Sequence, residues 1–145
     1  MRHIIFLIAY IYFLFTDFKD KKIDIKAIAI YAVVSLMTIA FMRNTLTMNK
    51  FVDVLFSILF GLIIYILSYF SGEGIGLADG MYFVINGFLL TLKENIILFL
   101  TGLLVAFIVG IILIVFGKNK DREETKLPFM PCFLPAIIGY ILCIV

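Results

Sequence analysis

Apolar residues fill six long stretches of this chain, and polar residues collect between them. A helix needs about 20 mainly apolar residues to cross the hydrocarbon core of a bilayer, with about 17 as a practical lower limit. Such stretches cover residues 3–18, 27–42, 51–70, 78–92, 95–117 and 128–145. The pattern predicts an all-α integral membrane protein with about six transmembrane helices.

The polar connections are too short to hold a second folded unit. The longest are residues 17–26 and 118–127, so we expect residues 1–145 to form a single transmembrane domain. The first and fourth spans are short, which predicts that they tilt little, use flanking polar residues or end inside protein. The first apolar run ends without the small residues of a signal-peptide cleavage site, so we expect it to remain as a span.

Composition supports a membrane protein. Hydrophobic residues make up 64% of the chain and charged residues 15%, against about 45–50% and about 25% in soluble domains. A small soluble domain cannot bury so much apolar surface. The composition excludes a soluble enzyme, a disordered tail and a nucleic-acid-binding module, so the lipid bilayer is an expected partner and nucleic acid is not.

Basic residues in the loops predict the orientation, because cytoplasmic loops are enriched in Lys and Arg. The loops after the first and fifth spans carry Lys19, Lys21, Lys22, Lys26, Lys118, Lys120, Arg122 and Lys126. The other side carries Arg2, Arg43, Lys50 and Lys93. This asymmetry places both termini on the non-cytoplasmic side.

Neither a metal site nor a nucleophile–histidine pair is indicated. Cys132 and Cys143 lie in the last apolar stretch without CxxC spacing or a nearby His, so we expect apolar packing for both. A disulfide between them is not expected, since one helix would hold them about 16 Å apart. His3, the only histidine, is expected at the membrane face opposite the acidic pair described next, so a Ser–His or Cys–His pair is not expected there.

Acidic residues at span ends are the main candidates for function, because ionisable groups at membrane depth are costly. An Asp at such a place can also cap a helix or sit in headgroup water. Asp17 ends the first span and Asp79 opens the fourth. Two complete spans separate them, so both lie at the same membrane face. Asp53 opens the third span and lies at the opposite face, where capping or interfacial solvation is expected.

The other acids occur in polar loop sequence, where solvated side chains are expected. They are Asp20, Asp24, Glu73, Asp121, Glu123 and Glu124.

Two carboxylates held close together cannot both ionise easily, so they share one proton near neutral pH. Such a pair suits aspartic-protease chemistry, in which one group takes a proton from water and the other protonates the carbonyl oxygen. It equally suits a proton relay in a transporter. The spacing of Asp17 and Asp79 does not choose between the two.

A glycine-rich segment precedes the second of these acids. Gly72, Gly74, Gly76 and Gly80 make a loop that allows close backbone approach. It can be a plain connector, and phosphate binding is discounted because the Walker lysine and the G-x-G-x-x-G spacing are absent. The loop delivers Asp79 directly into a membrane helix.

These features together resemble the type IV prepilin peptidases, which are membrane aspartyl peptidases of the GxGD type. The first match runs from Asp17 to Ile23, an Asp at a span end followed by a basic stretch. The second, Gly76 to Asp79, has Ala78 in place of the second Gly of Gly-x-Gly-Asp. The third, Leu127 to Pro131, is similar to the Pro-Phe-x-Pro segment that opens a late span. The matches fall in order and together extend over most of the chain.

The resemblance implies an aspartic endopeptidase with Asp17 and Asp79 as catalytic residues and Gly76, Ala78 and Gly80 supporting the active-site loop. It implies no metal and no cofactor. The expected substrates are prepilin or pseudopilin-like proteins with a basic leader, cleaved at the cytoplasmic face of a prokaryotic plasma membrane, in type IV pilus assembly or protein secretion.

The chain also departs from the family pattern. Asp24 and Ile25 stand where the family often has Pro-Asn, and Gly80-Met81-Tyr82 stands where a Lys often follows the second Asp. The cysteine-bearing cytoplasmic region of larger relatives is missing, so we expect cleavage without N-methylation.

Two other functions fit parts of the pattern. A small transporter or channel subunit could use the same acids for ions or protons, and a structural membrane subunit would need neither Asp. Only the peptidase accounts for the three ordered matches.

Overall fold

The computed structural model describes residues 2–20, 24–42, 48–71, 76–116 and 130–144. Helices make up this part of the chain, with no strand among the described residues. They are α1 (Arg2–Asp20), α2 (Ile25–Met42), α3 (Met48–Ser71), α4 (Leu77–Leu89), α5 (Leu92–Phe116), the 3₁₀ helix η3 (Met130–Phe133) and α6 (Leu134–Ile144). The predicted all-α class is confirmed.

Several residues used to predict orientation and family lie outside the described residues. Among them are Lys21, Lys22, Arg43, Lys118, Lys120, Arg122, Lys126, Leu127, Pro128 and Phe129.

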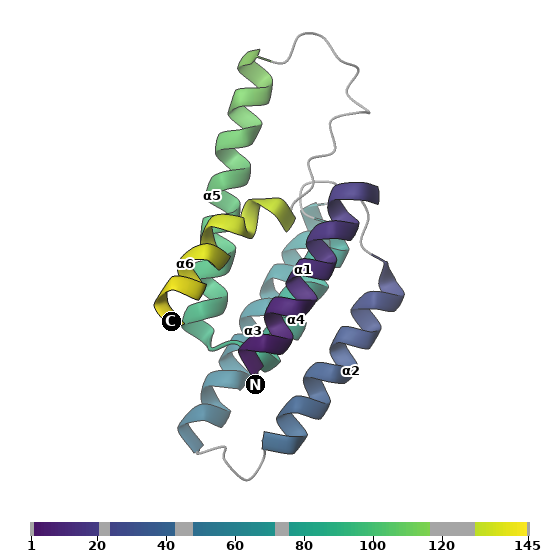
Figure 1. Ribbon diagram of the computed structural model, residues 1–145, viewed down its shortest axis with the longest axis vertical. Coiled ribbons are helices and arrows are strands. Elements are labelled where there is room, and N and C mark those ends of the chain that lie inside the picture. Colours follow the sequence, from purple (N-terminus) through teal and green to yellow (C-terminus); the bar gives the residue numbers. More distant parts are fainter. Residues whose placement is uncertain (1, 21–23, 43–47, 72–75, 117–129, 145) are drawn as a thin grey trace.

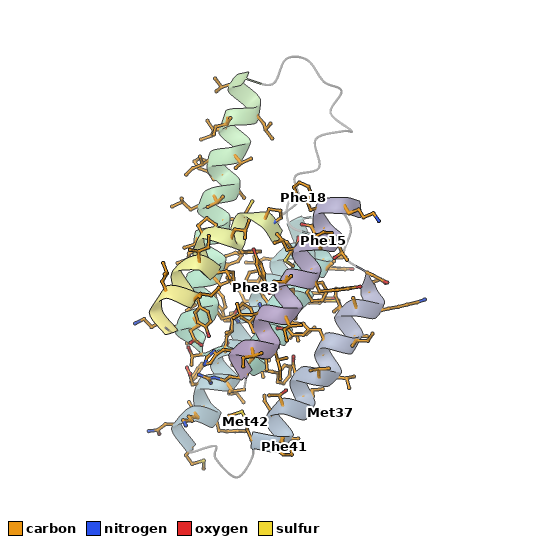
Figure 2. The ribbon with its side chains drawn as sticks, viewed as in Figure 1. Phe15, Phe18, Met37, Phe41, Met42 and Phe83 are labelled. Carbon is orange, nitrogen blue, oxygen red and sulfur yellow. The ribbon has the colours of Figure 1, made fainter. Side chains whose placement is uncertain are left out.

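Three helices are long and apolar enough to cross a membrane. They are Ile25–Met42, Met48–Phe70 and Leu92–Leu113, whereas Leu77–Leu89 and Met130–Leu142 are shorter apolar segments. Many large apolar side chains on the helices face outward: Phe15, Phe18 and Phe41 are 75%, 75% and 85% exposed. Figure 2 shows them projecting from α1 and α2, with Phe83 inside the bundle. This outward apolar surface is that of a membrane protein, because lipid covers it at no cost.

Successive helices run in opposite directions through the bundle, as Figure 1 shows. α3 and α4 form the most extensive contact, and α4 also packs against α1, α2 and α5. As a result α4 is enclosed by other helices.

The central helix α4 is shorter than the predicted span 78–92. Its 13 residues measure only about 20 Å, less than the roughly 30 Å of a hydrocarbon core. It stops because Leu90 turns to extended backbone and a new helix begins at once. Thr91 and Glu94 form the reciprocal hydrogen bonds of a capping box, with N···O distances of 2.7 and 3.3 Å. The enclosed position of α4 explains how a short helix is accommodated at membrane depth.

Glycines allow α3 and α4 to approach closely. A Cβ added at Gly61 would lie 2.6 Å from the Phe83 carbonyl oxygen, and one at Gly87 would lie 2.7 Å from the Ile58 nitrogen. Small residues at such contacts let membrane helices gain van der Waals packing. The pair α3–α4 is therefore built on backbone-to-backbone contact.

An aromatic core joins α1, α2 and α4. Phe13 packs edge-on against Tyr31 and Tyr82 with ring centroids 5.7 and 5.5 Å apart, and Tyr31 stacks on Tyr82. The buried residues of α1 are Phe6, Tyr10, Phe13 and Asp17, which share one helical face. Asp17 is the polar end of this otherwise aromatic face.

The last apolar stretch is not one continuous α-helix, unlike the predicted span 128–145. A 3₁₀ turn of four residues precedes α6. Pro131 lies in this turn and Pro135 in the first turn of α6, where the missing N–H has no intrahelical partner to lose. The prolines thus shape a short separate element where the sequence predicted uninterrupted helix.

Candidate active site

Asp17 lies at the inner face of α1, one turn from its end, and is only 6% exposed. Its Oδ2 accepts a hydrogen bond from the backbone N–H of Met130, with an N···O distance of 2.9 Å. The contact joins α1 to η3, at the opposite end of the sequence. A buried carboxylate requires such donors, because leaving it without hydrogen bonds is costly.

Asp79 is the third residue of α4 and is 9% exposed. Gly76 caps this helix, and its carbonyl oxygen accepts the N–H groups of Asp79 and Gly80 at 3.0 and 3.2 Å. The Asp79 carboxylate in turn accepts the backbone N–H of Gly76. The carboxylate is therefore folded back over the start of its own helix, where the helix dipole favours negative charge.

The structure brings Asp17 and Asp79 together. Their carboxyl groups interact electrostatically with each other, although they come from helices separated by α2 and α3. Both also interact electrostatically with the thiol of Cys132 in η3. Three elements, α1, α4 and η3, thus meet around the acidic pair.

The pair can supply a carboxylate and a carboxylic acid at the same time. Two carboxyl groups in one site hold a single proton between them over a range of pH. The first can accept a proton from water while the second donates one to a carbonyl oxygen. This is the chemistry that an aspartic peptidase needs.

The three predicted loop residues have different surroundings. A Cβ at Gly76 would lie 2.9 Å from Oδ2 of Asp79, whereas a Cβ at Gly80 would lie 2.8 Å from Cα of Tyr65 in α3. Gly76 therefore makes room for the carboxylate, and Gly80 makes room for α3. Ala78 is partly buried and packs against the buried hydrophobic core.

Cys132 is buried among core residues, as the sequence predicted. Its thiol also lies within electrostatic range of Asp17 and Asp79, which the sequence did not predict. The cause is the 3₁₀ turn, which directs Cys132 back toward α1 and α4. The side chain of Cys143 lies outside the described residues.

Asp53 and His3 belong to the other end of the bundle. Asp53 Oδ1 accepts the N–H of Leu92 at the start of α5, with an N···O distance of 3.3 Å, so it caps a neighbouring helix rather than its own. His3 hydrogen-bonds the Tyr140 hydroxyl, which also donates to Glu94 Oε1 at 3.3 Å. Asp17 is about 21 Å further along α1 from His3, so His3 is remote from the acidic pair.

Across the described residues, no three His, Cys, Asp or Glu side chains are grouped to hold a metal ion. Within the part of the chain that the structure describes, the polar groups around the acid pair are the two carboxyl groups, the Cys132 thiol and the backbone of α4 and η3.

Two contacts at the site were not predicted from the sequence. The Met130 N–H reaches Asp17, and the Tyr10 hydroxyl donates to the Met130 carbonyl oxygen at 3.1 Å. A signal for Tyr10 was present in the sequence, since Tyr10 and Asp17 are two helical turns apart on one face. The position of Met130 had no comparable signal, because it depends on a contact between the two ends of the chain.

Comparison of the chain with family models, curated proteins and solved structures finds no match. The roles of Asp17, Asp79, Gly76, Ala78 and Gly80 accordingly stay predictions, supported by geometry and by the motif resemblance.

Proposed function

We propose that this protein is a membrane aspartic endopeptidase that removes the leader peptide from type IV prepilin-like substrates. The single observation that carries the proposal is the convergence of Asp17 and Asp79, both buried and electrostatically coupled. A buried acid pair is expensive to maintain in a membrane protein and is a functional site by default.

The proposed reaction uses the two carboxyl groups and one water molecule. One Asp, as carboxylate, takes a proton from the water while the water oxygen bonds to the scissile carbonyl carbon. The other Asp, as carboxylic acid, gives its proton to the carbonyl oxygen. When the tetrahedral gem-diol intermediate collapses, the C–N bond breaks and the protonated Asp gives its proton to the leaving amine. The ionised Asp takes a proton from a hydroxyl group of the intermediate, so the pair again holds one proton. Either Asp can act as the base, with the other as the acid.

The start of α4 is the proposed approach for the substrate. Gly76 is exposed and Leu77 is 47% exposed, directly beside the nearly buried Asp79. An extended peptide lying along this segment would bring its carbonyl to the acid pair. At membrane depth its backbone needs protein partners, and Gly76 has no side chain that would block such contacts.

The choice of substrate rests on the motif resemblance and on the distribution of basic residues. A basic leader on the cytoplasmic side, followed by an apolar membrane helix, would place the scissile bond at the membrane surface. We propose a prokaryotic plasma membrane as the location and pilus assembly or secretion as the process. Asp17 and Asp79 occupy one end of the bundle, where such a boundary would lie.

Co-expression with a prepilin-like protein in bacteria tests the proposal. The wild-type protein should convert the precursor to a shorter form on a gel, and the Asp79→Asn variant should leave it intact. Equal processing with both proteins, or none with the wild type across a panel of prepilin-like substrates, would contradict the peptidase. It would leave the acid pair to ion or proton movement.

A further inference from the structure

The backbone of Met130 is hydrogen-bonded to α1 through both its N–H and its carbonyl oxygen. Its N–H donates to Asp17 Oδ2 at 2.9 Å, and its carbonyl oxygen accepts the Tyr10 hydroxyl at 3.1 Å. Both contacts are buried. Tyr10 and Asp17 lie two turns apart on one face of α1, and both side chains therefore hydrogen-bond the backbone of the same residue.

η3 needs such support because it is too short to hold itself in place. It has four residues, and 3₁₀ hydrogen bonds are poorer in geometry than those of an α-helix. Its first N–H has no acceptor within the turn, and Asp17 provides one. The hydroxyl of Tyr10 holds the carbonyl of the same residue, which belongs to the next peptide group along the chain.

Packing holds the opposite end of η3. The ring of Phe133 fills the space beside Gly102 of α5, where an added Cβ would overlap its Cε1. The same ring packs edge-on against Phe83 with centroids 5.4 Å apart. These contacts anchor Phe133 at one end of η3, and Tyr10 and Asp17 hold the backbone of Met130 at the other end.

We propose that Tyr10 is a positioning residue for the acid pair, acting through the backbone of Met130. By holding the carbonyl of this residue, Tyr10 fixes the place of Met130 in η3, which keeps its N–H directed at Oδ2 and so holds the Asp17 carboxylate in position relative to Asp79. The inference rests on the proposed peptidase function. A small misplacement of a reacting group is costly for rate, because near-attack geometry is narrow.

Tyr10→Phe is the main variant, since it removes only the hydroxyl. With purified protein and a prepilin-like peptide, kcat should fall by about tenfold or more while KM stays within about twofold, the signature of lost geometry rather than lost binding. Tyr31→Phe is the matched control. This variant also removes a buried hydroxyl, which donates to Asn86 Oδ1 at 2.8 Å. No described hydrogen bond joins that hydroxyl to η3, so the kcat of Tyr31→Phe should be unchanged.

A second measurement follows the contact without activity. The chain contains six methionines. In the NMR spectrum of protein labelled with ¹⁵N-methionine, the Met130 amide signal is identified as the one that disappears in the Met130→Leu variant. Its amide proton should be shifted downfield and protected from exchange by the charge-assisted bond to Asp17. Tyr10→Phe should reduce both effects, and Tyr31→Phe should not.

Gly102→Ala provides a test if Tyr10→Phe does not fold. It displaces Phe133 and thus η3 without altering α1, and it should give the same fall in kcat at constant KM. An unchanged kcat and an unchanged Met130 signal in Tyr10→Phe, together with inactive Asp17→Asn, would overturn the role of Tyr10 and leave the peptidase standing. Active Asp17→Asn and Asp79→Asn variants would overturn both.

Discussion

Gly76 lies directly behind the carboxylate of Asp79, so close that a Cβ at Gly76 would be 2.9 Å from Oδ2. The two residues close the first turn of α4, with the carboxylate accepting the Gly76 N–H. The absence of a side chain at residue 76 is thus a condition for the observed position of Asp79.

Gly76→Ala should lower activity while the protein still folds. The clash is with the end of a side chain, so Asp79 can rotate away and the backbone need not move. We expect kcat to fall by about tenfold with little change in thermal stability. Gly110→Ala is the control, because a Cβ there meets nothing within 4 Å. Equal activity of the two variants would show that the position of Asp79 does not depend on Gly76.

Gly61→Ala and Gly87→Ala should destabilise the fold. An added methyl group at either site would lie 2.6–2.7 Å from backbone atoms of the facing helix, and backbone cannot move aside as a side chain can. Overpacking of this kind costs about 1–3 kcal/mol. Thermal unfolding in detergent should show both variants melting below the wild type. Gly139→Ala, where a Cβ meets nothing within 4 Å, should melt no lower than the wild type, and a uniform effect at all three would argue against the α3–α4 packing.

Labelling of introduced cysteines should define the orientation. Lys26, at the start of α2, and Lys50, at the start of α3, are both exposed and lie at opposite ends of the bundle. The excess of basic residues in the loops after the first and fifth spans predicts that Lys26→Cys reacts with impermeant reagents in inside-out vesicles and Lys50→Cys in intact spheroplasts. The reverse pattern would invert the orientation but keep Asp17 and Asp79 at one end.

Activity should persist in EDTA and in the Cys132→Ser variant. The proposed mechanism uses carboxyl groups and water, and the Cys132 thiol neighbours the pair without serving as a nucleophile. Peptide cleavage by purified protein is the measurement. Loss of activity in EDTA would indicate a metal site. Loss in Cys132→Ser with intact folding would assign the thiol a part in the reaction.

The hydrophobic pattern predicted the all-α class and the approximate limits of the helices among the described residues, because burial in lipid requires long apolar runs. The predicted helix limits were wrong where a capping residue or a proline ended a helix inside an apolar run. α4 stops at Leu89 because Thr91 and Glu94 cap the next helix. This capping box can be recognised from the sequence of residues 91–94 alone. Likewise, Pro131 is evident in the sequence, but the 3₁₀ turn in which it lies could not be predicted, because that turn depends on contacts with α1 and α5.

The site was predictable in part for a similar reason. Counting membrane crossings placed Asp17 and Asp79 at one face without any knowledge of packing. The contacts of Met130 with Tyr10 and Asp17 join residues 120 and 113 positions apart, and no local pattern encodes such pairs. The burial of Cys132 was predicted from its apolar sequence neighbours, but its approach to Asp17 and Asp79 was not, because these residues are distant in sequence.

The most direct test is mass spectrometry of a prepilin-like peptide after incubation with purified wild-type protein, Asp17→Asn and Asp79→Asn. The wild type should cut one bond between the basic leader and the apolar segment. Each variant should be slower by about 100-fold or more, because an amide can neither accept nor donate the required proton. Asp53→Asn should remain within about twofold of wild type, since the amide oxygen can still accept the Leu92 N–H. Full cleavage by either Asp17→Asn or Asp79→Asn would contradict the account.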